Sequence, residues 1–341
     1  MNNYKVCLII GNGFDLNMGL HTRYSEFYQH LEKTGFFSTN ADCEFIQFMK
    51  KCPDYWYNFE LCIEHYALAS NDSKYFREDY NKYDMYQKEE RKERQQKIMR
   101  FFNSLRDELK KYIYEQDRIS SNLNLKECRI LFSVLGLDTS SYKSIYDGIL
   151  NNYIGDTQRI HFNVNNRIIS FNYTDPYWLL GWCVFGSVNS TSRMPMLRAN
   201  NNLTDVFWPI HGHFLNDDLV LGAKADEEVP PELYFLVKEN QYDDDRKTKF
   251  TSILKQSELI IVFGHSIHGT DLEYYLPFLR SDLNQDIFII TGTNQEEYDI
   301  KTVLAECKIK RKNIYYIHLA EREESELNKF EALIKRVEET I

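Results

Sequence analysis

The chain has 341 residues, 43% of them hydrophobic, which is enough to bury the core of one large domain or of two ordinary ones. Its 51 acidic residues outnumber its 41 Lys and Arg, and this acidity argues against non-specific nucleic-acid binding, which depends on basic side chains neutralising phosphates. Dispersed cysteines without a C-x-x-C pair, no apolar stretch of roughly 20 residues and no signal-peptide pattern together predict a cytoplasmic protein with reduced thiols and no membrane span.

The first predicted element is a buried strand at Lys5–Ile10, an apolar run that ends in a glycine. Strand signals then become rare, and a long helix is predicted over Gln87–Gln116 because apolar side chains repeat there at helical spacing. We therefore expect an all-helical insertion at 35–155 within a domain formed by 1–34 and 156–341. The apolar positions of the long helix are Ile98, Phe101, Phe102, Leu105, Leu109, Tyr112 and Ile113.

Strand-like runs return after the insertion and alternate with helical stretches. A parallel connection needs a long crossover, usually a helix, so the alternation predicts a mainly parallel sheet. The predicted fold class is α/β: a Rossmann-like, doubly wound sheet with a large all-helical insertion. The predicted strands are Arg167–Ser170, Asp205–Ile210, Glu258–Phe263, Asp286–Thr291 and Asn313–His318, with Leu219–Gly222 as a shorter one. The predicted helices are Asp245–Lys255, Asp271–Leu283, Gln295–Cys307 and Glu321–Thr340.

The first candidate site is the turn GNGFDLNMG at Gly11–Gly19, which leads from a strand toward a helix. Glycine accepts positive φ and lets backbone N–H groups approach a ligand, and a following helix N-terminus favours an anion. The turn therefore predicts a phosphate site. Its third glycine departs from the G-x-G-x-x-G spacing of dehydrogenases, and a tight turn without a ligand is the alternative.

Two further candidate sites follow predicted strands, at the carboxyl ends where open α/β sheets bind ligands. In IISFNYTD, Asn172 could bond a ribose hydroxyl or orient a water, while Thr174 or Asp175 could instead cap the next helix. In FWPIHGH, His211 is a candidate general base because histidine titrates near neutrality. A purely structural role is the alternative for His211, and His213 is the weaker candidate.

The fourth segment, LIIVFGHSIHGTDLEYY, again places a glycine after a strand, and Thr270 or Asp271 is predicted to cap the helix that follows. It repeats the pattern of the first turn and is predicted to hold another part of the same ligand. His265 and His268 have no companions at metal-ligand spacing, so no metal is predicted. GHSIHG also departs from the G-x-S-x-G elbow of serine hydrolases, because its second glycine stands one position late.

Together and in this order, these segments resemble the AbiH family of bacteriophage abortive-infection proteins. The resembling stretches are LIIGNGFDLNMGLHTRYSEF, SFNYTD, IHGH with LVLG, and FGHSIHGTD. The same order is similar, more distantly, to the sirtuin-like superfamily, which implies a Rossmann-like domain that binds NAD. By that resemblance, Asn172 contacts the nicotinamide ribose and His211 is the base. The full set of expected ligand-binding residues is Gly11, Asn12, Gly13, Phe14, Asp15, Gly19, Thr22, Thr174, Gly264, His265, Ser266 and Asp271.

The sequence also departs from the sirtuin pattern. Asp15 stands where sirtuins have a small residue, Thr22 stands near their acidic loop residue, and the zinc-binding cysteine pairs are absent, which argues against protein deacetylation. Sirtuin-like defence proteins without deacetylase features cleave NAD, so the resemblance implies hydrolysis of the nicotinamide glycosidic bond. A non-catalytic nucleotide or ADP-ribose sensor, and a hydrolase of another nucleotide or of nucleic acid, are the alternatives. The expected partners are a second copy of the chain or a phage-derived trigger.

Overall fold

The structure is a computed structural model in which the chain forms two compact units. The first unit comprises Met1–Leu20, Asp117–His213 and Lys247–Ile341, and the second comprises His21–Gln116 and Phe214–Arg246. Each unit is therefore assembled from separate stretches of the chain. The residues that the structure describes are 5–51, 59–72, 85–119, 130, 134, 166–174, 207–212, 219–224, 229–241, 245–319, 331–337 and 339.

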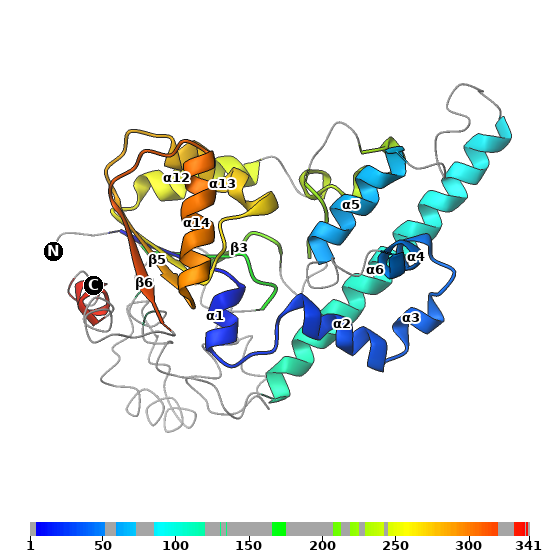
Figure 1. Ribbon diagram of the computed structural model, residues 1–341, viewed down its shortest axis with the longest axis horizontal. Coiled ribbons are helices and arrows are strands. Elements are labelled where there is room, and N and C mark those ends of the chain that lie inside the picture. Colours follow the sequence, from blue (N-terminus) through cyan, green and yellow to red (C-terminus); the bar gives the residue numbers. More distant parts are fainter. Residues whose placement is uncertain are drawn as a thin grey trace, which may run out of the picture. The chain divides into compact units, whose positions relative to one another are not determined.

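A six-stranded parallel sheet forms the centre of the first unit (Figure 1). Its order is β3-β2-β1-β4-β5-β6, so the chain adds strands outward on one side of β1 and then on the other. In open sheets of this order, nucleotides bind outside the carboxyl ends of the strands at the reversal beside the first strand. The strands are β1 (Val6–Ile10), β2 (Arg167–Ser170), β3 (Phe207–Pro209), β4 (Leu259–Phe263), β5 (Asp286–Thr291) and β6 (Ile314–His318).

The central strands β1 and β4 are buried along their whole length. Strands covered on both faces read as continuous apolar runs, here VCLII and LIIVF, rather than as an alternating pattern. The two strands pair in register from Val6 with Leu259 to Ile10 with Phe263. Their carboxyl ends are therefore level, and the turns that follow them lie side by side.

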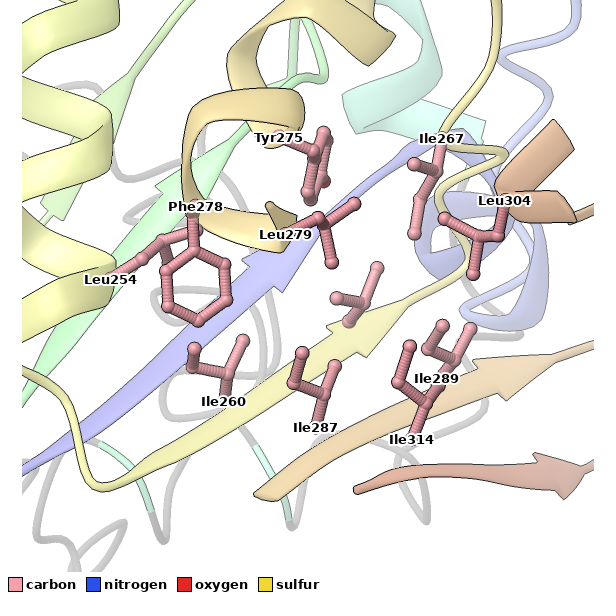
Figure 2. A pocket seen from close by; sticks show the side chains of 11 residues that line it. Leu254, Ile260, Ile267, Tyr275, Phe278, Leu279, Ile287, Ile289, Leu304 and Ile314 are labelled. Carbon is pink, nitrogen blue, oxygen red and sulfur yellow. The ribbon is translucent and has the colours of Figure 1, made fainter. Parts of the chain in front are cut away.

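Three helices pack on one face of this sheet: α12 (Asp245–Gln256), α13 (Leu272–Leu279) and α14 (Asn294–Glu306). Their side chains and those of β4, β5 and β6 surround an apolar cavity of about 10 Å³ (Figure 2). Figure 2 shows Leu279 of α13 above Ile260 of β4 across this space. A void that small barely holds one water and offers it almost no polar partner, so it is a gap in core packing rather than a ligand site.

Helices dominate the described part of the second unit, and aromatic rings form its core. The ring of Phe45 lies 5.8 Å from that of Phe101 and 5.0 Å from that of Phe102, measured between centroids. The helices are α2 (Tyr24–Lys33), α3 (Phe36–Thr39), α4 (Glu44–Lys51), α5 (Phe59–Asp72) and α6 (Met85–Ile119), with the 3-10 helices η4 (Pro231–Leu236) and η5 (Lys238–Asn240). No helix among the described residues is both long and apolar enough to cross a bilayer.

The predicted α/β class, its parallel sheet and a helical region between β1 and β2 are confirmed. So is the long helix, whose seven predicted apolar positions are all buried in α6. The short strand predicted at Leu219–Gly222 is wrong: none of these residues is in a strand, and the next residue, Ala223, makes an isolated bridge with Val237. The neighbour of this segment is the 3-10 helix η4, whose backbone cannot continue the hydrogen-bond ladder of a β-sheet. The predicted domain boundaries stay a prediction, although α2, placed with the sheet by the sequence, belongs to the second unit.

Candidate functional site

The turns after β1 and β4 press against each other, and glycine allows the contact. A Cβ on Gly13 would lie 2.7 Å from Gly264 Cα, and a Cβ on Gly264 would lie 2.2 Å from the nitrogen of Phe14. Gly264 also has a φ of +62°, a left-handed conformation that other residues adopt at a cost. The N–H of Gly13 donates to the carbonyl of Gly264 at 2.7 Å, which ties the two turns together.

Backbone donors of the first turn bond within the protein. The N–H of Gly11 donates to Phe263 O at 2.9 Å, and the N–H of Phe14 donates to Gly11 O at 2.8 Å. A short helix, α1 (Asn12–Asn17), begins inside this turn. Packing and backbone hydrogen bonds therefore explain why glycine is needed at these positions. The contact of these glycines with a phosphate stays a prediction.

Asn172 connects the end of β2 to the first turn. Its Nδ2 donates to Gly11 O at 2.9 Å and to Asp15 Oδ1 at 2.8 Å. Both partners are acceptors, which settles the orientation of the amide because the reverse orientation would turn Oδ1 toward them. Thr174 Oγ1 donates to the other carboxyl oxygen, Asp15 Oδ2, at 2.7 Å. Residues predicted from two distant segments thus form one buried network.

The carboxyl of Asp15 lies wholly inside this network, with 1% of the residue exposed. Burial raises its pKa to about 7, although the hydrogen bonds from Thr174 and Asn172 act in the opposite direction. Desolvation prevails because two neutral donors replace only part of the water that a carboxylate binds. A buried carboxyl that titrates near neutrality is typical of functional sites.

His211 follows β3 and is 2% exposed. Its Nε2 lies 3.1 Å from Oδ1 of Asp271, the last residue of the 3-10 turn η6 (Gly269–Asp271). Since an ionised carboxylate only accepts hydrogen bonds, Nε2 carries a hydrogen, and whenever the ring is neutral Nδ1 carries the lone pair. Nδ1 is buried, and it has no hydrogen-bond partner among the described residues.

His265, in the turn after β4, faces the same aspartate. Its Nε2 lies 3.4 Å from Asp271 Oδ2, and its Nδ1 lies 3.2 Å from the hydroxyl of Tyr275. Burial raises the pKa of Tyr275 well above its ordinary value, so the phenol keeps its proton. The ring of Phe171 packs on His265 with centroids 4.1 Å apart.

The register of β2 and β3 brings Asn172 and His211 level. Ser170 of β2 pairs with Pro209 of β3. Asn172 stands two positions after Ser170, and His211 stands two positions after Pro209. Asn172 Oδ1 and His211 Nδ1 are both buried without a hydrogen-bond partner in the described part of the chain. Such atoms are rare in folded proteins and call for a ligand or water that completes them. Asn172 Oδ1 and His211 Nδ1 therefore mark the candidate site.

The order of these groups along the chain agrees with a known family. Residues 7–291, most of the chain, match the family described as Bacteriophage abortive infection AbiH. The chain belongs to the AbiH family. This protein is therefore a phage abortive-infection defence protein. No curated protein and no solved structure matches the chain, and the sirtuin-like resemblance stays a prediction.

The remaining residues predicted to bind the ligand in this AbiH protein differ in burial and in location. Phe14 is buried and packs edge-on against Phe263, whereas Asn12 and Ser266 are exposed in their turns. Gly19 follows α1 with a φ of +89°. Thr22 belongs to the second unit, so its expected role at the site stays a prediction. His213 and Asp175 lie outside the described residues.

Two site residues of the AbiH chain were not predicted. Tyr275 reaches His265 from the first helical turn after Asp271, and Phe171 supports the same ring from the end of β2. Their sequence signals, one aromatic in an apolar helix and one at a strand end, do not distinguish them from ordinary core residues. Among the described residues, no group of three or more His, Cys, Asp and Glu is arranged to hold a metal ion.

Proposed function

We propose that this protein binds NAD at the carboxyl edge of its sheet and hydrolyses the bond between nicotinamide and ribose. The observation that carries the proposal is the pair of buried, unpartnered atoms Asn172 Oδ1 and His211 Nδ1 at neighbouring strand ends. The strand order supports a dinucleotide, since sheets of this order bind dinucleotides beside their first strand. Membership of an abortive-infection family supports a destructive reaction, because such a protein has to stop the infected cell.

The reaction consumes one water for each NAD. The bond between ribose C1′ and the nicotinamide nitrogen breaks, and its electron pair moves into the pyridinium ring, which leaves as neutral nicotinamide. The water oxygen bonds to C1′ to give ADP-ribose, and the released proton goes to His211 Nδ1. General-base catalysis of this kind contributes about 10²–10⁴-fold.

Asn172 has a positioning role in this scheme. Its amide is anchored by Gly11 O and Asp15 on one side, so Oδ1 faces away from them in a single orientation. That oxygen accepts a hydrogen bond from the attacking water or from a ribose hydroxyl. Holding a reactant in one geometry lowers the entropic cost of the reaction.

The proposal is tested by incubating purified protein with NAD, alone and with lysate of phage-infected cells, and separating nicotinamide and ADP-ribose by chromatography. Wild type should release both products in equal amounts, and ADP-ribose formed in ¹⁸O-water should gain one ¹⁸O. His211→Gln should reduce cleavage at least 100-fold, in line with the contribution of a general base. Asn172→Ala should reduce it by about 10²-fold, the cost of a reactant held out of position.

His318→Gln provides the matched control. His318 is also a buried histidine at a strand end, and it contacts the carboxylate of Glu297. It lies on β6, the edge strand farthest from β3, which His211 follows. Its substitution should leave cleavage unchanged. If NAD stays intact with wild type under every condition, hydrolysis is the wrong assignment. Calorimetric binding of NAD without turnover, unchanged in His211→Gln, would favour a sensor instead.

A further inference from the structure

Asp271 occupies a position where aspartate ordinarily caps a helix, yet it does something else. It directly precedes α13 as the N-cap residue, and its side chain makes no capping hydrogen bond. Such a side chain normally accepts a bond from the backbone of the second or third helical residue. Its two oxygens instead face His211 Nε2 at 3.1 Å and His265 Nε2 at 3.4 Å.

The backbone around His265 determines which of its nitrogens carries the hydrogen. The N–H of Ile267 donates to His265 Nδ1 at 3.1 Å, so Nδ1 holds the lone pair and Nε2 holds the hydrogen that faces Asp271. Ile267 has a φ of +48°, a left-handed conformation that is a true outlier for a β-branched residue. Strain of this kind concentrates at functional sites.

We propose that Asp271 is the positioning residue for His211, and that His265 holds Asp271 in place. Two N–H groups converge on one carboxylate, which leaves His211 with its hydrogen on Nε2 and its lone pair on Nδ1, the buried and unpartnered atom. This inference rests on the proposed function, since it names the groups that keep the proposed base in its reactive form.

Asp271→Asn separates this role from simple helix capping. Asparagine caps helices about as well as aspartate does, so a structural role predicts little change in folding or activity. A positioning role predicts a different result, because the new amide group can donate to His211 Nε2 and thereby move the ring hydrogen to Nδ1. The lone pair would then point away from the substrate, as it does when the aspartate of an Asp–His pair in a serine protease is replaced.

The first measurement needs no NAD. Long-range ¹H–¹⁵N spectra of histidine-labelled protein, assigned with His211→Gln, should show a hydrogen on Nε2 of His211 in wild type and on Nδ1 in Asp271→Asn. Glu273→Gln is the matched control, because Glu273 is a nearby carboxylate in α13 whose side chain bonds Lys247. It should leave the His211 signals unchanged.

The second measurement is NAD cleavage. We expect kcat of Asp271→Asn to fall about 10²–10⁴-fold with KM nearly unchanged, Asp271→Glu to recover part of the loss, and Glu273→Gln to match wild type. A wild-type tautomer together with wild-type kcat in folded Asp271→Asn overturns the inference. If wild type leaves NAD intact but the ring hydrogen of His211 still moves to Nδ1 in Asp271→Asn, the proposed reaction is contradicted. The positioning role of Asp271 is then retained.

Discussion

Asp15 is the residue whose protonation links the site to the stability of the protein. Its carboxyl accepts hydrogen bonds from Asn172 and Thr174 and has a pKa of about 7, against 3.8 for an ordinary aspartate. Between pH 3.8 and about pH 7, Asp15 is mostly protonated in the folded state and mostly ionised in the unfolded state. The contribution of Asp15 to the free energy of unfolding therefore falls as the pH rises through this interval.

Asp15→Asn should remove this dependence, because the amide does not titrate. We expect the free energy of unfolding of wild type to fall by about 2 kcal/mol between pH 5 and pH 7 relative to the variant. Urea unfolding at several pH values measures the difference. Asp299→Asn, which removes the same charge from an exposed position, should follow wild type. Parallel curves for wild type and Asp15→Asn would show that the buried carboxyl holds no extra proton.

At the scale of single residues, the sequence located the candidate side chains but not their bonds. Asn172 and His211 could be predicted because each follows an apolar strand, and strand ends in parallel sheets meet at one edge. The bond from Asn172 to Asp15 spans 157 positions of the chain, and no local pattern encodes it. The bond from Asp271 to His211 is hidden in the same way, since its local context predicts a helix cap.

The contact between the two glycine turns decides how closely β1 and β4 can end. Gly264 and Gly269 have nearly the same left-handed φ, +62° and +60°, but only Gly264 is crowded. Backbone atoms lie within 2.5 Å of a Cβ built on Gly264, whereas nothing lies within 4 Å of one built on Gly269. The two positions thus separate steric exclusion from conformational preference.

Gly264→Ala should be much more destabilising than Gly269→Ala. We expect about 1 kcal/mol for Gly269→Ala from its left-handed conformation alone, and about 1–3 kcal/mol more for Gly264→Ala from overpacking against backbone. Chemical denaturation of both variants checks the order. Equal losses would mean that the two turns separate easily.

At the scale of elements, the six strands were predicted to within two residues. The central strands β1 and β4 are continuous apolar runs because they are buried on both faces. Helix α1 was not predicted as an element of its own, since its six residues begin inside the glycine turn and carry no helical period. The segment at Leu219–Gly222 is as apolar as a strand, but its neighbour is a 3-10 helix. A pattern of hydrophobicity reports burial and does not reveal which partner covers the chain.

At the scale of the molecule, each unit has a buried core of its own, and we expect two calorimetric transitions. Lys238, 2% exposed, bonds Glu60 at 2.8 Å within the second unit. Lys238→Met removes the cation that bonds the largely buried carboxylate of Glu60, and breaking a buried ion pair in this way costs about 3–5 kcal/mol. One transition should therefore move to lower temperature while the other stays in place.

Lys247→Met is the control for that experiment. Lys247 bonds Glu273 at the same distance, 2.8 Å, but both side chains are about one-third exposed and belong to the first unit. Exposed pairs contribute about 0–1 kcal/mol, so this variant should melt almost as wild type does. A single transition that shifts as a whole in Lys238→Met would show that the units unfold together.

The interlocked glycine turns also limit how this protein can be recombined. Gly13 and Gly264 stand 251 positions apart in the numbered sequence, yet neither has room for a methyl group while the other keeps its place. A chimaera that takes the first loop from a distant relative and keeps its own second loop would inherit a collision between backbones. The two loops have to be transplanted as a pair, and with them the strand ends on which the asparagine and the histidine stand.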